Sequence, residues 1–158
     1  MPQITPNLWF DRQGEEAAEF YVSLFPNSKI TNVTYYTDAG PGPAGTPVTV
    51  DFVLDGQSFT AINGGPAFTF DEAMSLLINC ADQEEVDYYW GKLTADGGQE
   101  SQCGWCKDKY GLSWQVVPVQ LNKLINDPDE QRRARGMRAM LQMKKIDIAA
   151  LIAAASGD

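Results

Sequence analysis

The first half of the chain alternates between segments that favour strands and one segment with helical spacing. The strands are expected at Ile4–Phe10, Lys29–Thr37, Val48–Leu54 and Ser58–Ile62. Asp11–Gly14 ends the first strand, and the apolar residues that follow recur with the spacing of one helix face. Asp55-Gly56 supplies a hairpin turn between the last two strands. The first half therefore predicts the order βαβββ.

The second half begins again with the same kinds of segment. Met74–Cys80 favours a strand, Asp82 is placed to cap a helix, and two more strands are expected at Glu100–Lys107 and Leu112–Val117. The two expected helices share one pattern, because six residues of the first lie at one constant offset from six of the second. These are Glu15, Glu16, Ala17, Phe20, Tyr21 and Leu24, matched with Glu84, Glu85, Val86, Tyr89, Trp90 and Leu93. The repetition indicates a duplicated unit.

A helical appendage is expected after the duplicated part. Asp127-Pro128-Asp129-Glu130 has a capping carboxylate, a proline for the first turn and acids facing the helix dipole, and this helix is expected to run to about Met143. A last short helix should follow Asp147. The chain is expected to contain two modules, at about 1–68 and 72–120, which together form one α+β domain over 1–120. The appendage is expected at 121–158. The appendage is expected to pack on this domain or on a dimer partner.

Composition and charge narrow the function classes. The chain has 158 residues, 44% of them hydrophobic, and no apolar run approaches the roughly 20 residues of a membrane span. A net charge of −9 argues against binding to nucleic acid or to anionic membranes. The N-terminal residues lack the basic and apolar regions of a signal peptide, so a cytoplasmic location is expected. Since the sequence contains no histidine, histidine-based metal sites and catalytic triads are excluded.

Several stretches of the chain carry a resemblance to a known family. They are Ile4–Asp11, Ala18–Tyr21, Asp71–Leu76, Gly104–Pro118 and the tail Met143–Leu151. On these residues the chain resembles the PhnB-like family of the vicinal oxygen chelate superfamily, which includes glyoxalases, bleomycin-resistance proteins and dioxygenases. The resemblance spans nearly the whole chain.

The resemblance implies two tandem βαβββ units whose sheets form a half-open curved surface, with a ligand cleft on the concave face and often a homodimer. In the superfamily, metal ligands come from the first and last strands of each unit. The matching positions here are Thr5 or its neighbour Ile4, Asn63, Ser75 and Gln115. Hydroxyl and amide oxygens are poor donors for a divalent catalytic ion, so no metal and no other cofactor is expected.

Two further residues are expected to line the cleft. Trp105 lies among small and polar residues, so it is expected either to wall the cleft and stack a planar ligand or to pack in the core. If Trp114 faces the helices, the alternation of a strand directs Ser113 and Gln115 to the cleft.

Two short motifs suggest cofactor or redox chemistry but are better explained by structure. The glycines at 40, 42 and 45 have the G-x-G-x-x-G spacing, yet Pro41 and Pro43 lack N–H donors and a strand, not a helix, is expected to follow. Cys103 and Cys106 form a C-x-x-C, but residues three apart on a strand point to opposite faces. We therefore expect a connecting loop in the first case and free thiols in the second.

Three hypotheses for the function remain open. The leading one is a metal-free small-molecule-binding protein that uses Thr5, Asn63, Ser75, Trp105, Ser113 and Gln115. The second is an isomerase-, lyase- or dioxygenase-type enzyme in the same cleft, with a metal or an acid pair that the sequence does not reveal. The third is a structural or regulatory homodimer that acts through its C-terminal helices and their basic residues.

Overall fold

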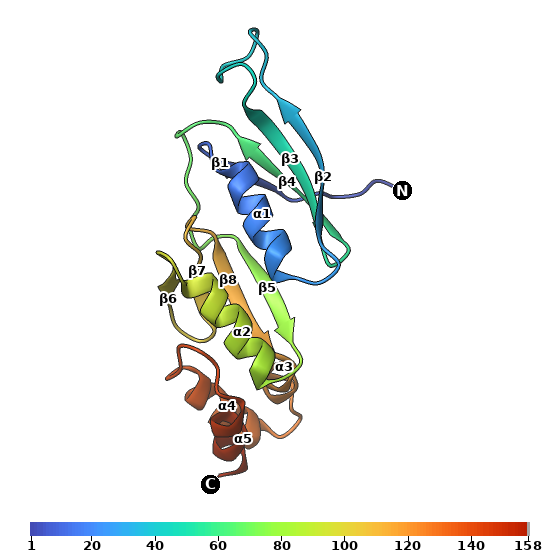
Figure 1. Ribbon diagram of the computed structural model, residues 1–158. Helices are drawn as coiled ribbons and strands as arrows, with labels where there is room; N and C mark the ends of the chain where they lie inside the picture. Colours follow the sequence, from blue (N-terminus) through green and yellow to red (C-terminus); the bar gives the residue numbers. More distant parts are fainter. Residues whose placement is uncertain (158) are drawn as a thin grey trace. The chain divides into compact units, whose positions relative to one another are not determined.

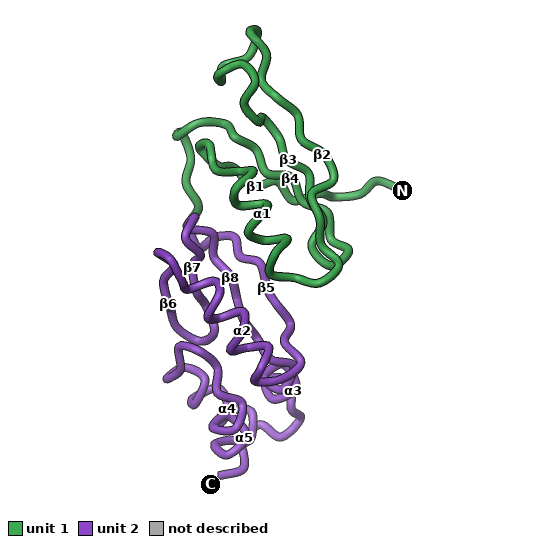
Figure 2. Tube along the Cα trace, viewed as in Figure 1, with its two compact units in different colours: residues 1–70 green, residues 71–158 purple. Residues whose placement is uncertain are grey.

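The computed structural model describes residues 1–157, which form two compact units. Unit 1 comprises Met1–Phe70 and unit 2 begins at Asp71 (Figure 2). Both units contain a four-stranded sheet with one helix between its first and second strands. The α+β fold and the tandem βαβββ order expected from the sequence are therefore confirmed.

Unit 1 is a sheet whose first and last strands lie side by side. Its elements are β1 (Asn7–Phe10), α1 (Gly14–Leu24), β2 (Lys29–Tyr35), β3 (Pro47–Leu54) and β4 (Gln57–Asn63). The strand order is β1-β4-β3-β2, in which β1 and β4 are parallel and the other neighbours antiparallel. Helix α1 lies across one face of this sheet (Figure 1). The opposite face is called the open face of unit 1.

Alternation along the strands decides which side chains meet α1. On β3, Val50, Phe52 and Leu54 are buried, whereas the residues between them are only half-buried. Phe52 stacks on Phe59 of β4 and lies next to Tyr21 of α1. Burying each such side chain contributes about 1.5–3 kcal/mol, so the helix-facing row is the core of the unit.

Unit 2 repeats the plan of unit 1. Its first elements are β5 (Ser75–Cys80), α2 (Gln83–Thr94), β6 (Gln99–Glu100), β7 (Trp105–Lys107) and β8 (Ser113–Pro118). The order β5-β8-β7-β6 matches that of unit 1, again with the outer pair β5 and β8 parallel. The side chain of Asp82 accepts a hydrogen bond from the Glu85 N–H at 2.9 Å, as expected for the cap of α2. The face of this sheet away from α2 is called the open face of unit 2.

Unit 2 also carries the C-terminal helices, α3 (Val119–Ile125), α4 (Glu130–Met140) and α5 (Ile148–Ser156). Asp129 and Asp147 cap α4 and α5 through their side chains. A buried apolar cluster joins these helices to the end of β8. Its members are Val117, Leu121, Leu124, Ile146, Leu151 and Ala155. The appendage thus shares a core with unit 2.

Some expected boundaries are wrong. The expected strand Glu100–Lys107 is split into β6 and β7, because Cys103 and Gly104 turn with positive φ and donate their N–H groups to the carbonyls of Met143 and Lys144. Helix α3 was not expected, since it has no capping side chain and only seven residues.

Within residues 1–157, no helix is long and apolar enough to cross a membrane.

Candidate functional site

Four of the six expected ligand-binding residues lie together on the open face of unit 2. In the strand register Ser75 is opposite Ser113, and Trp105 is opposite Gln115. Residues directly opposite one another share a face, and so do residues two apart on one strand. The Gln115 side-chain amide donates to the Ser75 hydroxyl at 2.9 Å. The four residues therefore form one cluster on the adjacent strands β5, β8 and β7, and their role in ligand binding stays a prediction.

The Ser113 hydroxyl is the unusual member of this cluster. The residue is only 1% exposed, and its Oγ has no hydrogen-bond partner in the part of the chain that the structure describes. A hollow of about 130 Å³ adjoins it, and the lining includes Trp105 and Lys107. A buried hydroxyl without a partner costs about 1–3 kcal/mol. Such a group is available to an atom that enters the hollow.

The charged residues that line this hollow are Lys107, Glu72 and Glu100, and the Glu100 carboxylate accepts a hydrogen bond from the Trp90 indole N–H at 2.9 Å. The Lys107 ammonium forms an ion pair with the Glu72 carboxylate, and both residues line the hollow. The hydrogen bond from Lys107 is the largest cause that lowers the pKa of Glu72 below its ordinary value. Since the Glu72 side chain is 62% exposed, water screens this pair and its contribution to stability is small. Among the described residues, Lys107 is therefore the one basic residue that lines this hollow, and the carboxylate that pairs with it is exposed to water.

Side chains on the helix-facing side of β8 fix the position of Ser113. The buried carboxylate of Asp108 accepts hydrogen bonds from the Leu112 N–H and, at 2.8 Å, from the Trp114 indole N–H. Trp114 is buried on the helix side, so Ser113 and Gln115 face the other way, as alternation predicted. The role of Asp108 was not predicted from the sequence. Its position before a Tyr110-Gly111 turn is typical of an aspartate that binds the backbone after it.

The cysteines near the site are free thiols, as expected for this C-x-x-C. Burial raises the pKa of Cys106 to about 12, with Asp108 and Glu100 adding to the effect. Burial likewise raises the pKa of Cys80 to about 12. Only Cys103, in the turn before β7, is partly exposed. Cys80 and Cys106 are thus packing residues and poor nucleophiles at neutral pH.

The two expected residues of unit 1 have different surroundings. Thr5 is exposed and precedes β1, and its carbonyl accepts a hydrogen bond from the Asn7 side chain at 2.9 Å. Asn63 is 6% exposed and lies on the helix side of its sheet. Its Oδ1 accepts from the Gly14 N–H at 2.7 Å and its Nδ2 donates to the Pro47 carbonyl at 3.1 Å. Asn63 thus connects α1 to the sheet, and its expected role in ligand binding stays a prediction.

The glycine-rich loop is a strand-to-strand connection. It joins β2 to β3, and the Gly45 N–H donates to the Tyr36 carbonyl at 2.9 Å. The Gly40 N–H donates to the Thr37 carbonyl, and Pro41 and Pro43 have no N–H. A nucleotide-like cofactor needs free N–H groups at the start of a helix. These residues therefore do not fit a phosphate-bearing cofactor or a methyl donor of that type.

The donors at the expected metal positions do not fit a divalent catalytic ion. Ser75 and Gln115 bind each other, and the Asn63 oxygen binds Gly14. Within residues 1–157, no group of three or more histidine, cysteine, aspartate or glutamate side chains could hold a metal ion. Neutral hydroxyl and amide oxygens alone bind such ions weakly.

Comparison with known proteins agrees with this architecture. The sequence model of one family, described as 3-demethylubiquinone-9 3-methyltransferase, matches residues 2–117. A solved structure of a PhnB protein from Bacillus cereus, named for the same methyltransferase, is 38% identical, with a TM-score of 0.68; the match covers 74% of this chain and 99% of that one.

Two more distant structures share the fold alone. Protein PA1353 from Pseudomonas aeruginosa is 20% identical with a TM-score of 0.61, and the match covers 75% of this chain and 98% of that one. Protein SA1046 from Staphylococcus aureus is 19% identical with a TM-score of 0.51, over 75% and 97% of the two chains. No curated protein matches the chain.

Proposed function

Because the chain belongs to the PhnB-like family, whose sequence model is described as 3-demethylubiquinone-9 3-methyltransferase, we propose that it binds a small organic molecule on the open face of unit 2 without a metal. The observation that carries the proposal is the buried Ser113 hydroxyl, which adjoins a hollow and has no partner within residues 1–157. Proteins rarely leave such a group unsatisfied unless a ligand or water serves it.

The surroundings of Ser113 define the chemistry of the ligand. The half-buried Trp105 ring offers an apolar, planar surface, and aromatic rings stack favourably on it. The Lys107 ammonium attracts an anionic group, which would replace the Glu72 carboxylate as its partner. A planar molecule with an acid group would thus place its ring on Trp105 and its acid near Lys107 and Ser113.

Methyl transfer is not the function that these residues support best. The description of the family implies a methyl donor, but the glycine-rich loop between β2 and β3 uses its N–H groups within the hairpin. The hollow at Ser113 is also small, about 130 Å³, against the roughly 300–1,000 Å³ typical of a site that encloses a whole ligand. It would hold one acid group, with the rest of the ligand lying on the open face.

We propose two further properties that the resemblance and the composition support. One is a homodimer, which light scattering of the purified chain would test. The other is a cytoplasmic location, supported by the three free thiols, since disulfides are rare in reducing compartments.

The binding proposal can be tested by nuclear magnetic resonance with benzoate and 2-naphthoate as probes. We expect resonances of Trp105 and Lys107 to shift, and 2-naphthoate to bind more tightly because it covers more of the indole. Ser113→Ala should weaken binding roughly threefold to tenfold, the range expected for one lost hydrogen bond.

The matched control is Ser58→Ala. Ser58 is the exposed serine of β4 that corresponds to Ser113 by its position in the register, and its loss should leave binding unchanged. Equal affinities of the two variants, or the absence of shifts in unit 2, would contradict the proposal.

A further inference from the structure

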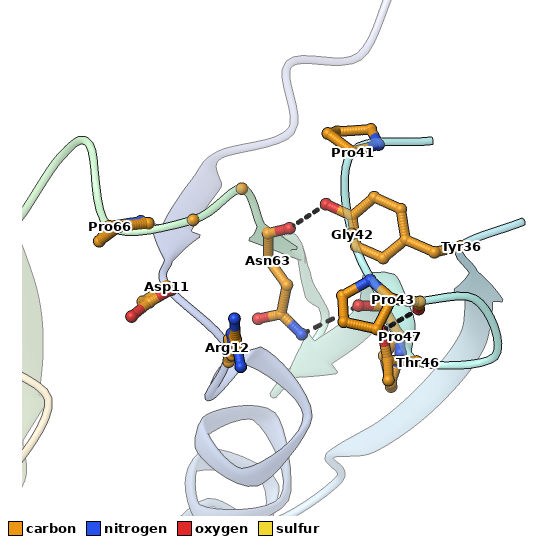
Figure 3. A pocket seen from close by; sticks show the side chains of 12 residues that line it. Asp11, Arg12, Tyr36, Pro41, Gly42, Pro43, Thr46, Pro47, Asn63 and Pro66 are labelled. Carbon is orange, nitrogen blue, oxygen red and sulfur yellow. Dashed lines mark hydrogen bonds between the residues drawn. The ribbon is translucent and has the colours of Figure 1, made fainter. Parts of the chain in front are cut away.

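A second hollow lies in unit 1, where β1 and β4 end. Its volume is about 370 Å³, close to the lower end for small-molecule sites. It is bounded by the residues after β1, the residues after β4 and the loop between β2 and β3. Figure 3 shows Asp11, Arg12 and Pro66 on one side of Asn63, and Tyr36, Pro41 and Pro43 on the other.

The wall formed by the β2–β3 loop is held in place. The Tyr36 hydroxyl donates a hydrogen bond to the Asn63 carbonyl, and the Tyr36 N–H donates to the Thr46 carbonyl at 2.8 Å. The loop folds against the Tyr36 ring so closely that a Cβ on Gly42 would overlap it. This contact explains why glycine occupies position 42. The hollow is therefore shaped by defined bonds and contacts within unit 1.

The two charged residues of the lining are opposite in sign and adjacent in sequence. Within residues 1–157, neither the Asp11 carboxylate nor the Arg12 guanidinium forms an ion pair. The remaining lining is largely proline, glycine and the tyrosine ring. One cation, one anion and an apolar wall suit a ligand with the complementary set of groups.

The corresponding end of unit 2 is covered by the chain itself. Gln83 begins α2 as Gly14 begins α1, and its side chain donates to the Ile146 carbonyl at 3.0 Å and accepts from the Ile148 N–H at 2.8 Å. These bonds attach the C-terminal segment to unit 2. Within the described residues, no segment covers the corresponding end of the sheet in unit 1. That end therefore has a hollow.

We propose that this hollow binds a small zwitterion, namely a free α-amino acid with an apolar or aromatic side chain. The carboxylate of the ligand pairs with the Arg12 guanidinium, which can donate two parallel hydrogen bonds. Its ammonium group pairs with Asp11. Its side chain lies against Pro41, Pro43 and the Tyr36 ring. A ligand with several negative charges is disfavoured because Asp11 repels it.

The test uses the full chain, labelled with ¹⁵N, and L-phenylalanine as the probe. We expect the amide resonances of Gly64 and Gly65, which line the hollow, to shift on titration. Phenylpropanoate lacks the ammonium group and phenethylamine lacks the carboxylate, so each should bind at least about tenfold more weakly. Arg12→Gln and Asp11→Asn should weaken L-phenylalanine binding by a similar factor.

Two matched variants control for changes in charge. Lys29→Gln removes the other basic residue of unit 1, and Asp55→Asn removes an exposed acid at a left-handed position that asparagine tolerates. Both should bind L-phenylalanine within about twofold of the unchanged chain. The proposal is overturned if either analogue binds as tightly as L-phenylalanine, if R12Q and K29Q have equal affinities, or if Gly64 and Gly65 do not shift.

Discussion

The two units share one topology but differ in what occupies the same end of the sheet. In unit 2 the chain continues from β8 into α3–α5, which bury a cluster of apolar side chains against that end. In unit 1 the chain leaves β4 through Gly64 and Gly65, and a hollow remains. A duplicated fold thus keeps its core pattern while the segments that follow each copy decide where ligands have access.

The open faces differ in a complementary way. By their position in the register, Asp51 and Thr60 of unit 1 correspond to Trp105 and Gln115 of unit 2. Asp51 accepts a hydrogen bond from Thr60 at 2.7 Å, so this polar pair satisfies itself. Unit 2 instead has an aromatic ring there and the unpartnered Ser113 nearby. The two copies therefore carry their candidate sites on different surfaces.

The largest expected effect concerns the dependence of unit 2 on its appendage. Leu151 of α5 is 0% exposed and belongs to the shared cluster, so Leu151→Ala should lower the free energy of unfolding by about 2–5 kcal/mol. Urea unfolding followed by tryptophan fluorescence measures this change, because three of the four tryptophans belong to unit 2.

Ile152→Ala is the control for this prediction. Ile152 is the neighbouring residue of α5 and is 50% exposed, so its loss should change stability by less than about 1 kcal/mol. Equal effects of L151A and I152A would mean that α5 does not belong to the core of unit 2.

A smaller loss is expected at the bond that joins α1 to its sheet in unit 1. Asn63→Ala removes two hydrogen bonds and leaves the buried Gly14 N–H without its acceptor, which should cost about 1–3 kcal/mol. Asn63→Asp keeps an acceptor for Gly14 and should lose less. Asn79→Ala, at an exposed position of β5, should have little effect on urea unfolding. If N63A were as stable as N79A, the hydrogen bonds of Asn63 to Gly14 and Pro47 would not stabilise unit 1.

The Ser113 hydroxyl should contribute to binding and not to stability. Ser113→Ala removes an unsatisfied buried group, so the free energy of unfolding should stay the same or rise, by no more than the roughly 1–3 kcal/mol that such a group costs. Thermal unfolding of S113A and of S58A would measure the difference between the units. A clear loss of stability in S113A alone would show that the hydroxyl has a structural partner.

The smallest expected effect is chemical and does not alter the fold. With pKa values of about 12, Cys80 and Cys106 are almost entirely protonated at pH 8 and should react very slowly with an aromatic disulfide reagent. One thiol, that of the partly exposed Cys103, should react in the native protein, and all three should react in urea. Rapid reaction of two thiols in the native protein would mean that Cys80 or Cys106 is accessible.

Local patterns were enough to predict most of the fold. The alternation in β3 and β4, the matched apolar stripes of α1 and α2 and the carboxylate at the start of α5 each depend on neighbouring residues. The same alternation predicted that Ser113 and Gln115 would share a face, because that relation follows from the geometry of a single strand. Trp105 joined them because β7 lies beside β8.

Relations between distant segments were decided only by the tertiary structure. The break between β6 and β7 depends on the carbonyls of Met143 and Lys144, and the role of Asn63 depends on Gly14. The hollow of unit 1 likewise requires Arg12, Tyr36 and Asn63 to meet from three separate segments. A sequence records the periodicity of each element, whereas hydrogen-bond partners and cavities arise only when remote elements pack, since no local pattern specifies which carbonyl a given N–H will reach.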